Sequence, residues 1–190
     1  IEKILSLKDI EEKYMLYSMS EPIKITDESK ISDEAKEKMG VNMSSYISVY
    51  ALDSSSFEKY AEKIHADYKS VKNKAILVDN SSKNNNLNYE IGDEIEGTCG
   101  KNSVSIPIGA RANILPSGKQ SIASLSYLVV DINEFDNLKF DLESIAIKTN
   151  DADGVQTAIE RISPNVHVNS DDQEVFGIME AMQLVVDVFK

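Results

Sequence analysis

The chain has 190 residues, of which 42% are hydrophobic and 27% charged, enough for one compact domain or two small lobes. Its net charge of −12, from 32 acidic and 20 basic residues, would repel a phosphate backbone and argues against nucleic-acid binding. The single cysteine, Cys99, excludes an internal disulfide and a cysteine-based zinc site.

The first 80 residues alternate between helical and strand-like patterns. Ile4, Leu7, Ile10 and Tyr14 fall at helical spacing, which predicts a helix over residues 3–17. Next come a short strand (23–25), a helix (32–40), a strand (45–52), a helix (53–68) and a strand (74–79).

Capping residues mark the ends of these helices. Ser32 or Asp33 caps the helix at 32–40, and Gly40 ends it. Asp53 is a candidate N-cap for the next helix, and Ser55 with Glu58 fits a capping box. Strand, capped helix and strand together resemble a βαβ or split βαβ unit.

The polar run "NSSKNNN" (80–86) predicts a loop or a hinge between lobes. Residues 87–131 then read as β structure, with strands near 88–97, 103–114 and 121–131 and a turn at 115–118. Residues 132–138 predict a short helical turn.

The last third returns to alternating elements. We expect a strand (142–149), a helix (150–162) capped by Asn150 or Asp151, a strand (165–169) and a final helix (171–190) opened by a Ser170/Gln173 capping box. The second half of that helix is apolar on most sides, which suits a buried core helix or a stalk above a membrane. No segment of these 190 residues has the pattern expected of a signal peptide, and no apolar run has the length expected of a membrane span.

These patterns predict an α+β fold with two lobes. Residues 1–80 and 138–190 would form a split mixed α/β, porter-like lobe near the membrane, with terminal stalk helices. Residues 87–137 would form an inserted small β-rich lobe.

Several segments resemble the extracytoplasmic domain of ABC transporter permeases of the MacB/FtsX type. They are "YISVYALDSSSFEKY" (46–60), "YEIGDEIEG" (89–97), "SYLVVDINEFDNL" (126–138) and "LESIAIKTNDADGVQTAIERI" (142–162), which is followed by "VHVNSDDQEVFGIMEAMQLVVDVFK". Their order and spacing carry the resemblance, and residues 18–45 match no part of it.

The resemblance implies a non-catalytic domain that transmits motion and contacts partners or cargo outside a bacterial cell membrane, of the Gram-positive type. It also implies a homodimeric permease, a cytoplasmic ATP-binding subunit and a possible extracellular peptide or protein partner. We therefore expect apolar segments before Ile1 and after Lys190.

Candidate chemical groups are few. His65 and His167 form no metal motif, and the nucleophile-elbow and phosphate-loop patterns are absent. "GTCGK" (97–101) predicts a β-turn that carries Cys99, while the acidic clusters at 92–96 and 169–172 lack calcium-loop spacing. The sequence therefore predicts no catalytic, cofactor-binding or metal-binding residue, and no cofactor.

Two alternatives remain open. The chain could be a free-standing surface lipoprotein, a binding module or small-ligand sensor, in which residues 183–190 pack against the body. It could instead be an intracellular enzyme with an unrecognised site, against which the scarcity of His, Cys and Arg argues.

Overall fold

The structure is a computed structural model that describes residues 2–79, 86–116, 125–164, 167–171 and 183–187. The strands are β1 (Glu12–Met19), β2 (Ile23–Ile25), β3 (Tyr46–Leu52), β4 (Ala75–Asp79), β5 (Glu94–Cys99), β6 (Asn102–Ala112), β7 (Ser126–Asp131), β8 (Phe140–Lys148), β9 (His167–Asp171) and β10 (Gln183–Asp187). The helices are α1 (Glu2–Leu5), α2 (Asp33–Ser44), α3 (Ser54–Lys63), α4 (Tyr68–Val71), α5 (Ala152–Ile162) and the 3₁₀ turn η1 (Glu28–Lys30).

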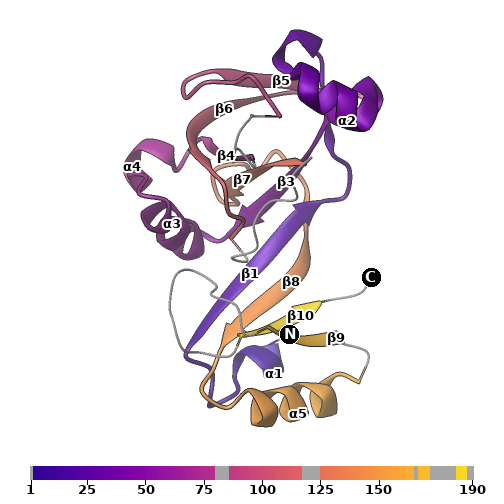
Figure 1. The fold of residues 1–190 in the computed structure, drawn as a ribbon. Coiled ribbons are helices and arrows are strands. Elements are labelled where there is room, and N and C mark those ends of the chain that lie inside the picture. Colours follow the sequence, from indigo (N-terminus) through magenta and orange to yellow (C-terminus); the bar gives the residue numbers. More distant parts are fainter. Residues whose placement is uncertain (1, 80–85, 117–124, 165–166, 172–182, 188–190) are drawn as a thin grey trace.

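Six of the strands close into a barrel. Their order is β2–β5–β6–β4–β7–β3, and β2 pairs again with β3 to complete the ring. The β3–β7 and β4–β6 pairs are parallel, and the other four contacts in the ring are antiparallel. The barrel occupies one end of the molecule (Figure 1).

A second region continues the sheet away from the barrel. Strand β3 pairs with β2 near its start and with β1 near its end. Strand β1 pairs along its length with β8, which in turn pairs with β10, and β9 follows β10. Figure 1 shows β1 and β8 leading from the barrel to α1, α5, β9 and β10 at the opposite end.

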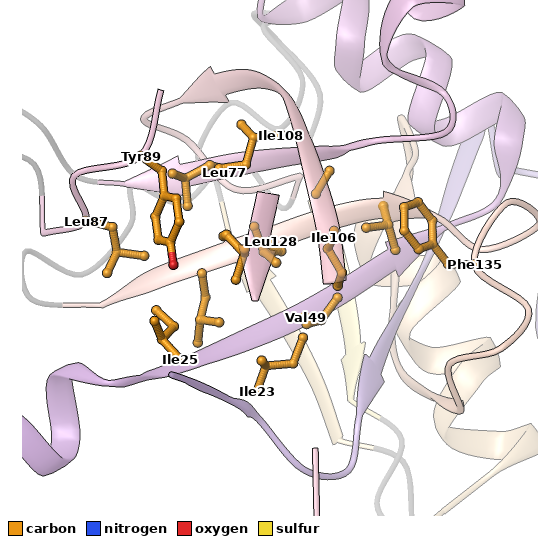
Figure 2. Close-up of a cluster of buried hydrophobic side chains, with 14 of the residues drawn as sticks. Ile23, Ile25, Val49, Leu77, Leu87, Tyr89, Ile106, Ile108, Leu128 and Phe135 are labelled. Carbon is orange, nitrogen blue, oxygen red and sulfur yellow. The ribbon is translucent and has the colours of Figure 1, made fainter. Parts of the chain in front are cut away.

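The barrel interior is aliphatic, as the lack of Trp and the low aromatic content require. Alternate residues of each strand point inward, and Figure 2 shows these side chains converging from different strands. The fully or nearly fully buried members include Ile23, Ile25, Ile47, Val49, Leu77, Leu87, Tyr89, Ile95, Ile106, Ile108, Leu128 and Val130.

Helix α3 covers part of the barrel's outer surface. Its side chains Phe57, Tyr60 and Ala61 are buried against residues of β3, β4 and β7. Asp53 caps the helix, because its carboxylate accepts from Ser56 N at 3.1 Å. The Tyr60 hydroxyl donates to the Ile114 carbonyl at 2.6 Å, which satisfies the polar end of a buried ring.

A separate apolar cluster holds the second region together. Val155 and Ile159 of α5 pack with Ile145 and Ile147 of β8, and Ile4 of α1 joins them. Between this cluster and the barrel, the β1–β8 register shifts by one residue, so that Glu143 has no direct partner on β1. The β1–β8 pair is thus the structural link between two apolar cores.

The expected two-lobed, porter-like α/β fold is wrong. Strands from residues 1–80 (β2, β3 and β4) and strands from residues 87–137 (β5, β6 and β7) share one closed ring, in which they pair with each other at β2–β5, β6–β4 and β7–β3 and also at β4–β7. The supposed insert is therefore half of a barrel and not a lobe of its own. Closure gives each of the six strands a partner on both sides over part of its length, which reduces the number of exposed sheet edges.

The expected terminal helices are also wrong within the described residues. Only residues 2–5 of the first are helical, and residues 12–19 form β1. Residues 167–171 and 183–187 form strands. Within the predicted helix over 171–190, the described residues 171 and 183–187 are therefore not helical. Ser170 lies in β9 and so opens no helix, while Gln173 lies outside the described residues.

The central elements agree with the sequence prediction. The strands expected at 23–25, 45–52, 74–79, 103–114, 121–131 and 142–149 correspond to β2, β3, β4, β6, β7 and β8. Ser32 caps α2, and Asp151 caps α5. Gly40 interrupts α2 at φ 76° instead of ending it, and a further helical turn follows.

Candidate functional site

A groove of about 380 Å³ lies where three distant segments meet. They are the end of β1 with the residues after it, the tip of the β5–β6 hairpin, and the segment that leads into β8. The lining residues are Met19, Ser20, Glu21, Cys99, Gly100, Lys101, Asn102, Ser103, Val104, Asn137, Leu138 and Lys139. This volume is at the lower end of the range of ligand sites.

The hairpin wall is built by a two-residue turn. Cys99 pairs with Asn102, so Gly100 and Lys101 form the turn. Gly100 has φ 57°, a conformation that favours glycine. The Cys99 thiol donates to the Glu21 carbonyl, with an Sγ to O distance of 3.8 Å, which holds the hairpin tip against the segment after β1.

A second glycine brings the hairpin close to β2. A Cβ atom at Gly97 would lie 2.5 Å from both Ile23 Cγ2 and the Lys24 carbonyl oxygen, so only glycine fits there. Thr26 adds two hydrogen bonds to β5, because its backbone N–H and its hydroxyl both donate to the Glu96 carbonyl, each at 3.2 Å. The position of the hairpin tip is therefore fixed from two sides.

The opposite wall is held by a buried carboxylate. Asp131, fully buried at the end of β7, accepts from Ser54 Oγ at 2.9 Å and from Asn133 N at 3.0 Å. Its other oxygen accepts from the Tyr68 hydroxyl at 3.4 Å. These bonds begin the turn after which Phe135 and Leu138 enter the barrel core.

The groove combines apolar and polar lining. Met19, Val104 and Leu138 supply half-buried or buried apolar surface, and Lys101, Lys139 and Glu21 are exposed charged residues. None of the hydrogen bonds found among the described residues pairs the Cys99 thiol with a base. The arrangement suits binding of a ligand and contains no nucleophile–base pair of the kind that covalent catalysis uses.

The candidate residues from the sequence are scattered over the described structure. His65 follows α3 with φ 59°, His167 lies in β9, and Cys99 lies at the predicted β-turn. No group of three or more His, Cys, Asp or Glu side chains suited to a metal lies within the described part of the chain.

The two acidic clusters differ in their surroundings. Asp93 accepts from Lys30 Nζ at 2.9 Å, and this hydrogen bond lowers the pKa of its carboxyl. Residues 169–171 belong to β9 and therefore do not open the helix that the sequence predicts over 171–190; Asp172 lies outside the described residues.

One buried polar network was missed by sequence reasoning. Asp79, 1% exposed, accepts from Leu87 N at 3.1 Å, from Ser126 Oγ at 3.2 Å and from Arg111 Nη2 at 3.3 Å. Arg111 also donates to the Tyr89 carbonyl. The network ties β4, β6 and β7 together, and its signal in the sequence was an arginine within an otherwise uncharged strand.

Comparison with known proteins gives no relative: no family model, no curated protein and no solved structure matches the chain. Among the described residues, no helix combines the length and the apolar character needed to cross a membrane.

Proposed function

We propose that this chain is a non-catalytic extracytoplasmic domain of a bacterial ABC transporter permease, and that it couples motion in the transport cycle to binding of cargo or a partner protein. The observation that carries the proposal is the ordered series of segments from residue 46 onward that resembles the MacB/FtsX-type domain. The partners would be a cytoplasmic ATP-binding subunit and a second copy of the permease.

The geometry is compatible with a coupling role. Segments near both ends of the described chain meet around β8: β1 and β10 pair with its two edges and β9 pairs with β10, while the helix α1 packs against α5. The barrel is therefore held at one end and presents the rest of its surface outward (Figure 1). Any movement imposed on β8 reaches the barrel through the β1–β8 pair.

The location can be tested with the chain's only cysteine. Cys99 is half-buried at a hairpin tip, so a membrane-impermeant maleimide should label it on intact native cells. Mass spectrometry of the peptide that contains Cys99 reads the result, with a cytoplasmic protein as the control. Labelling only after lysis would place the domain inside the cell and would contradict the proposal.

The transporter assignment needs a second experiment. The full-length parent protein, purified from native membranes in mild detergent, should retain an ATP-binding cassette subunit with vanadate-sensitive ATPase activity. A parent protein that fractionates with the membrane without any such subunit would contradict it.

One observation favours a free-standing binding module instead. This alternative predicts that the last residues pack against the body, and residues 183–187 do form β10, between β8 and β9. Deleting this strand should therefore destabilise the domain under either function. The ATPase experiment is the one that separates the two.

A further inference from the structure

Strands β1 and β8 pass from one apolar core to the other at the same level. On β1, Met15 packs with the cluster of the second region, whereas Tyr17 packs with the barrel core. On β8, Leu142 packs with the cluster of the second region and Phe140 packs with the barrel core. Each strand therefore changes from one core to the other within two residues.

The register shift between β1 and β8 lies at this level. Leu16 pairs with Ser144 and Tyr17 pairs with Leu142, so Glu143 is one extra residue on β8, a β-bulge. Its side chain is exposed. A bulge disrupts the hydrogen-bonded ladder locally and bends its strand. The ladder that links the two cores is therefore interrupted where the cores meet.

The flanking strands give the bulge little support. Pairing of β10 with β8 ends at Ser144, before the bulge. Pairing of β3 with β1 covers residues 16–18, so it extends past the bulge by a single pair, Leu16 with Leu52. Among the described strands, only β1 and β8 run from the barrel into the second region (Figure 1). A bend at Glu143 therefore disturbs few backbone pairs outside the β1–β8 ribbon.

One side chain of α3 reaches across this level to the far end of β1. Lys59 Nζ lies 3.6 Å from Glu12 Oε2 and 5.3 Å from the centroid of the Tyr14 ring. The Tyr14 hydroxyl donates to Glu12, and Lys148 Nζ of β8 lies 3.9 Å from the other Glu12 oxygen. Lys59 therefore joins the helix that covers the barrel to the β1–β8 ribbon beyond the bulge.

The Lys59 contacts combine opposite charges with an exposed position. The hydrogen bond from Tyr14 lowers the pKa of the Glu12 carboxyl, and the charges of Lys59 and Lys148 act in the same direction against burial. The Lys59 side chain is 50% exposed. Exposed ion pairs and cation–π contacts are individually weak, and neither apolar core includes Lys59. These contacts can therefore open while both cores stay packed.

We propose that the bulge at Glu143 is a hinge between the barrel and the second region, and that Lys59 is a latch that closes this hinge on Glu12 and Tyr14. With the latch closed, the two parts move together; with the latch open, the second region turns without the barrel. Hinges of this kind confine the backbone change to a few residues. The role of the hinge in coupling rests on the proposed function, because the latch sets how much of a movement at β8 reaches the barrel.

The direct test measures the distance between the two parts in the purified chain. Spin labels attached through Lys69→Cys on α4 and Arg161→Cys on α5, both exposed positions, report it by double electron–electron resonance, with Cys99→Ser to remove the native thiol. Lys59→Gln should raise the population of a second distance by about 3- to 30-fold, as expected for loss of one exposed ion pair and one cation–π contact. Identical distance distributions with and without Lys59→Gln would overturn the proposal.

A lysine of the barrel part provides the matched control. Lys72 is 48% exposed and its Nζ lies 3.3 Å from Glu134 Oε1, but this ion pair joins two segments of the barrel part. Lys72→Gln should therefore leave the distances unchanged. A second distance that Lys72→Gln populates as strongly as Lys59→Gln would contradict the latch.

Salt supplies an independent test of the latch. Raising the ionic strength from about 0.1 to 1 M shortens the Debye length from about 10 to 3 Å. The wild type should then shift toward the second distance, whereas the chain with Lys59→Gln should respond much less. An equal response in both chains would mean that the Lys59–Glu12 pair does not hold the two parts together.

Deletion of Glu143 tests the position of the hinge. Leu16 and Tyr17 keep their partners Ser144 and Leu142, so the deletion makes the β1–β8 register continuous. The second distance should then disappear, also in the Lys59→Gln background. A second distance that persists in the folded deletion variant would contradict a hinge at the bulge.

If the deletion variant does not fold, amide hydrogen exchange locates the hinge. In Lys59→Gln, exchange at residues 142–144 should be at least about threefold faster than in the wild type. Val130 in the barrel and Ile147 in the second region should keep their protection. Unchanged exchange at residues 142–144, or equal acceleration at all these sites, would overturn the hinge.

The hinge and the transporter assignment fail separately. A chain without a second distance leaves the results of the ATPase and labelling experiments unaffected. A parent protein without an ATP-binding subunit removes the role of the hinge in transport but changes none of the distances expected here.

Discussion

His65 has φ 59°, the one positive value found outside glycine in the described part of the chain. It follows the C-cap residue of α3, where His65 N donates to the Glu62 carbonyl and Ala66 N donates to the Ala61 carbonyl. These two bonds are those of a Schellman motif, whose left-handed position usually holds glycine.

The residue at position 65 therefore limits stability. We expect His65→Gly to raise the free energy of unfolding by about 0.5–1 kcal/mol. Glycine relieves the strain of the left-handed conformation in the folded state, and its higher conformational entropy in the unfolded state offsets only part of this gain. Urea denaturation at constant m-value measures it. His65→Ala keeps the Cβ atom and should show no gain; equal effects of both variants would mean that strain is not the cause.

Buried phenols make stability depend on alkaline pH. Burial raises the pKa of Tyr89 to about 12, and the negative charges of Asp27, Asp93 and Glu96 act in the same direction. Burial also raises the pKa of Tyr50 to about 12. An unfolded tyrosine ionises near pH 10. The stabilisation is thus present below pH 10 and is lost as the pH rises from about 10 to 12.

Tyr89→Phe removes one of these groups. The free energy of unfolding should fall less steeply between about pH 10 and 12 in this variant than in the wild type, and the double variant with Tyr50→Phe should flatten the profile further. Urea denaturation across this interval gives the slopes. Identical slopes in all three proteins would show that these phenols are not linked to unfolding.

At the scale of single elements, α3 tests which residue caps a helix. The sequence offered Asp53 and a Ser55/Glu58 capping box, and in the structure it is Asp53 that accepts from Ser56 N. Asp53→Ala should cost about 1 kcal/mol of stability. Ser55→Ala, an exposed change two residues after the cap, should leave thermal unfolding unchanged, and a larger effect of Ser55→Ala would reverse the assignment.

The elements that were predictable are those with one dominant local signal. The strands β3 and β4 are short apolar runs rich in β-branched residues and bounded by polar ones. Helices α3 and α5 begin at identifiable caps and keep an apolar stripe. In each case the local pattern and the tertiary environment favour the same structure.

The elements that were mispredicted lack such agreement. In β1, residues Tyr14 to Tyr17 are all at least half-buried, because apolar clusters lie on both faces of the strand. The alternation of apolar and polar residues that marks a half-buried strand is therefore absent from its sequence. The run "LVV" in β10 is compatible with a buried helix or a buried strand, and periodicity cannot separate the two. Pairing with β8, which both strands share, decides the outcome.

The groove was predictable only in its local part. The glycine turn at the hairpin tip is visible in "GTCGK". The groove itself needs residues 19–21 and 137–139 beside the hairpin, and no local pattern relates segments more than a hundred residues apart. The same holds for Asp79 and Arg111, which meet across 32 positions.

At the scale of the whole molecule, one continuous sheet joins two apolar cores. Because β1 and β8 contribute to both, we expect a single cooperative unfolding transition. Ile159→Ala, at a fully buried site on α5, should cost about 2–5 kcal/mol and shift the far-ultraviolet circular dichroism and tyrosine fluorescence transitions together. An early loss of helix signal with an intact barrel would contradict this coupling.

The matched control lies on the same helix. Ile162 is 37% exposed, so Ile162→Ala should change the free energy of unfolding by no more than about 0.5 kcal/mol. A comparable loss in both variants would indicate that burial in the core is not what sets the cost at Ile159, since alanine has the higher helix propensity at both positions.

The pairing of β1 with β8 also sets an order of events during synthesis on the ribosome. Glu12 pairs with Lys148, so the first strand leaves the ribosome long before its main partner exists. At about 5–20 residues per second, the 136 positions from Glu12 to Lys148 take roughly 7–27 seconds, whereas β3, β4 and β7 can meet sooner. Until β8 emerges, β1 can pair only with the end of β3, through Leu16, Tyr17 and Ser18, and the β1 edge that β8 occupies in the final fold stays without its partner.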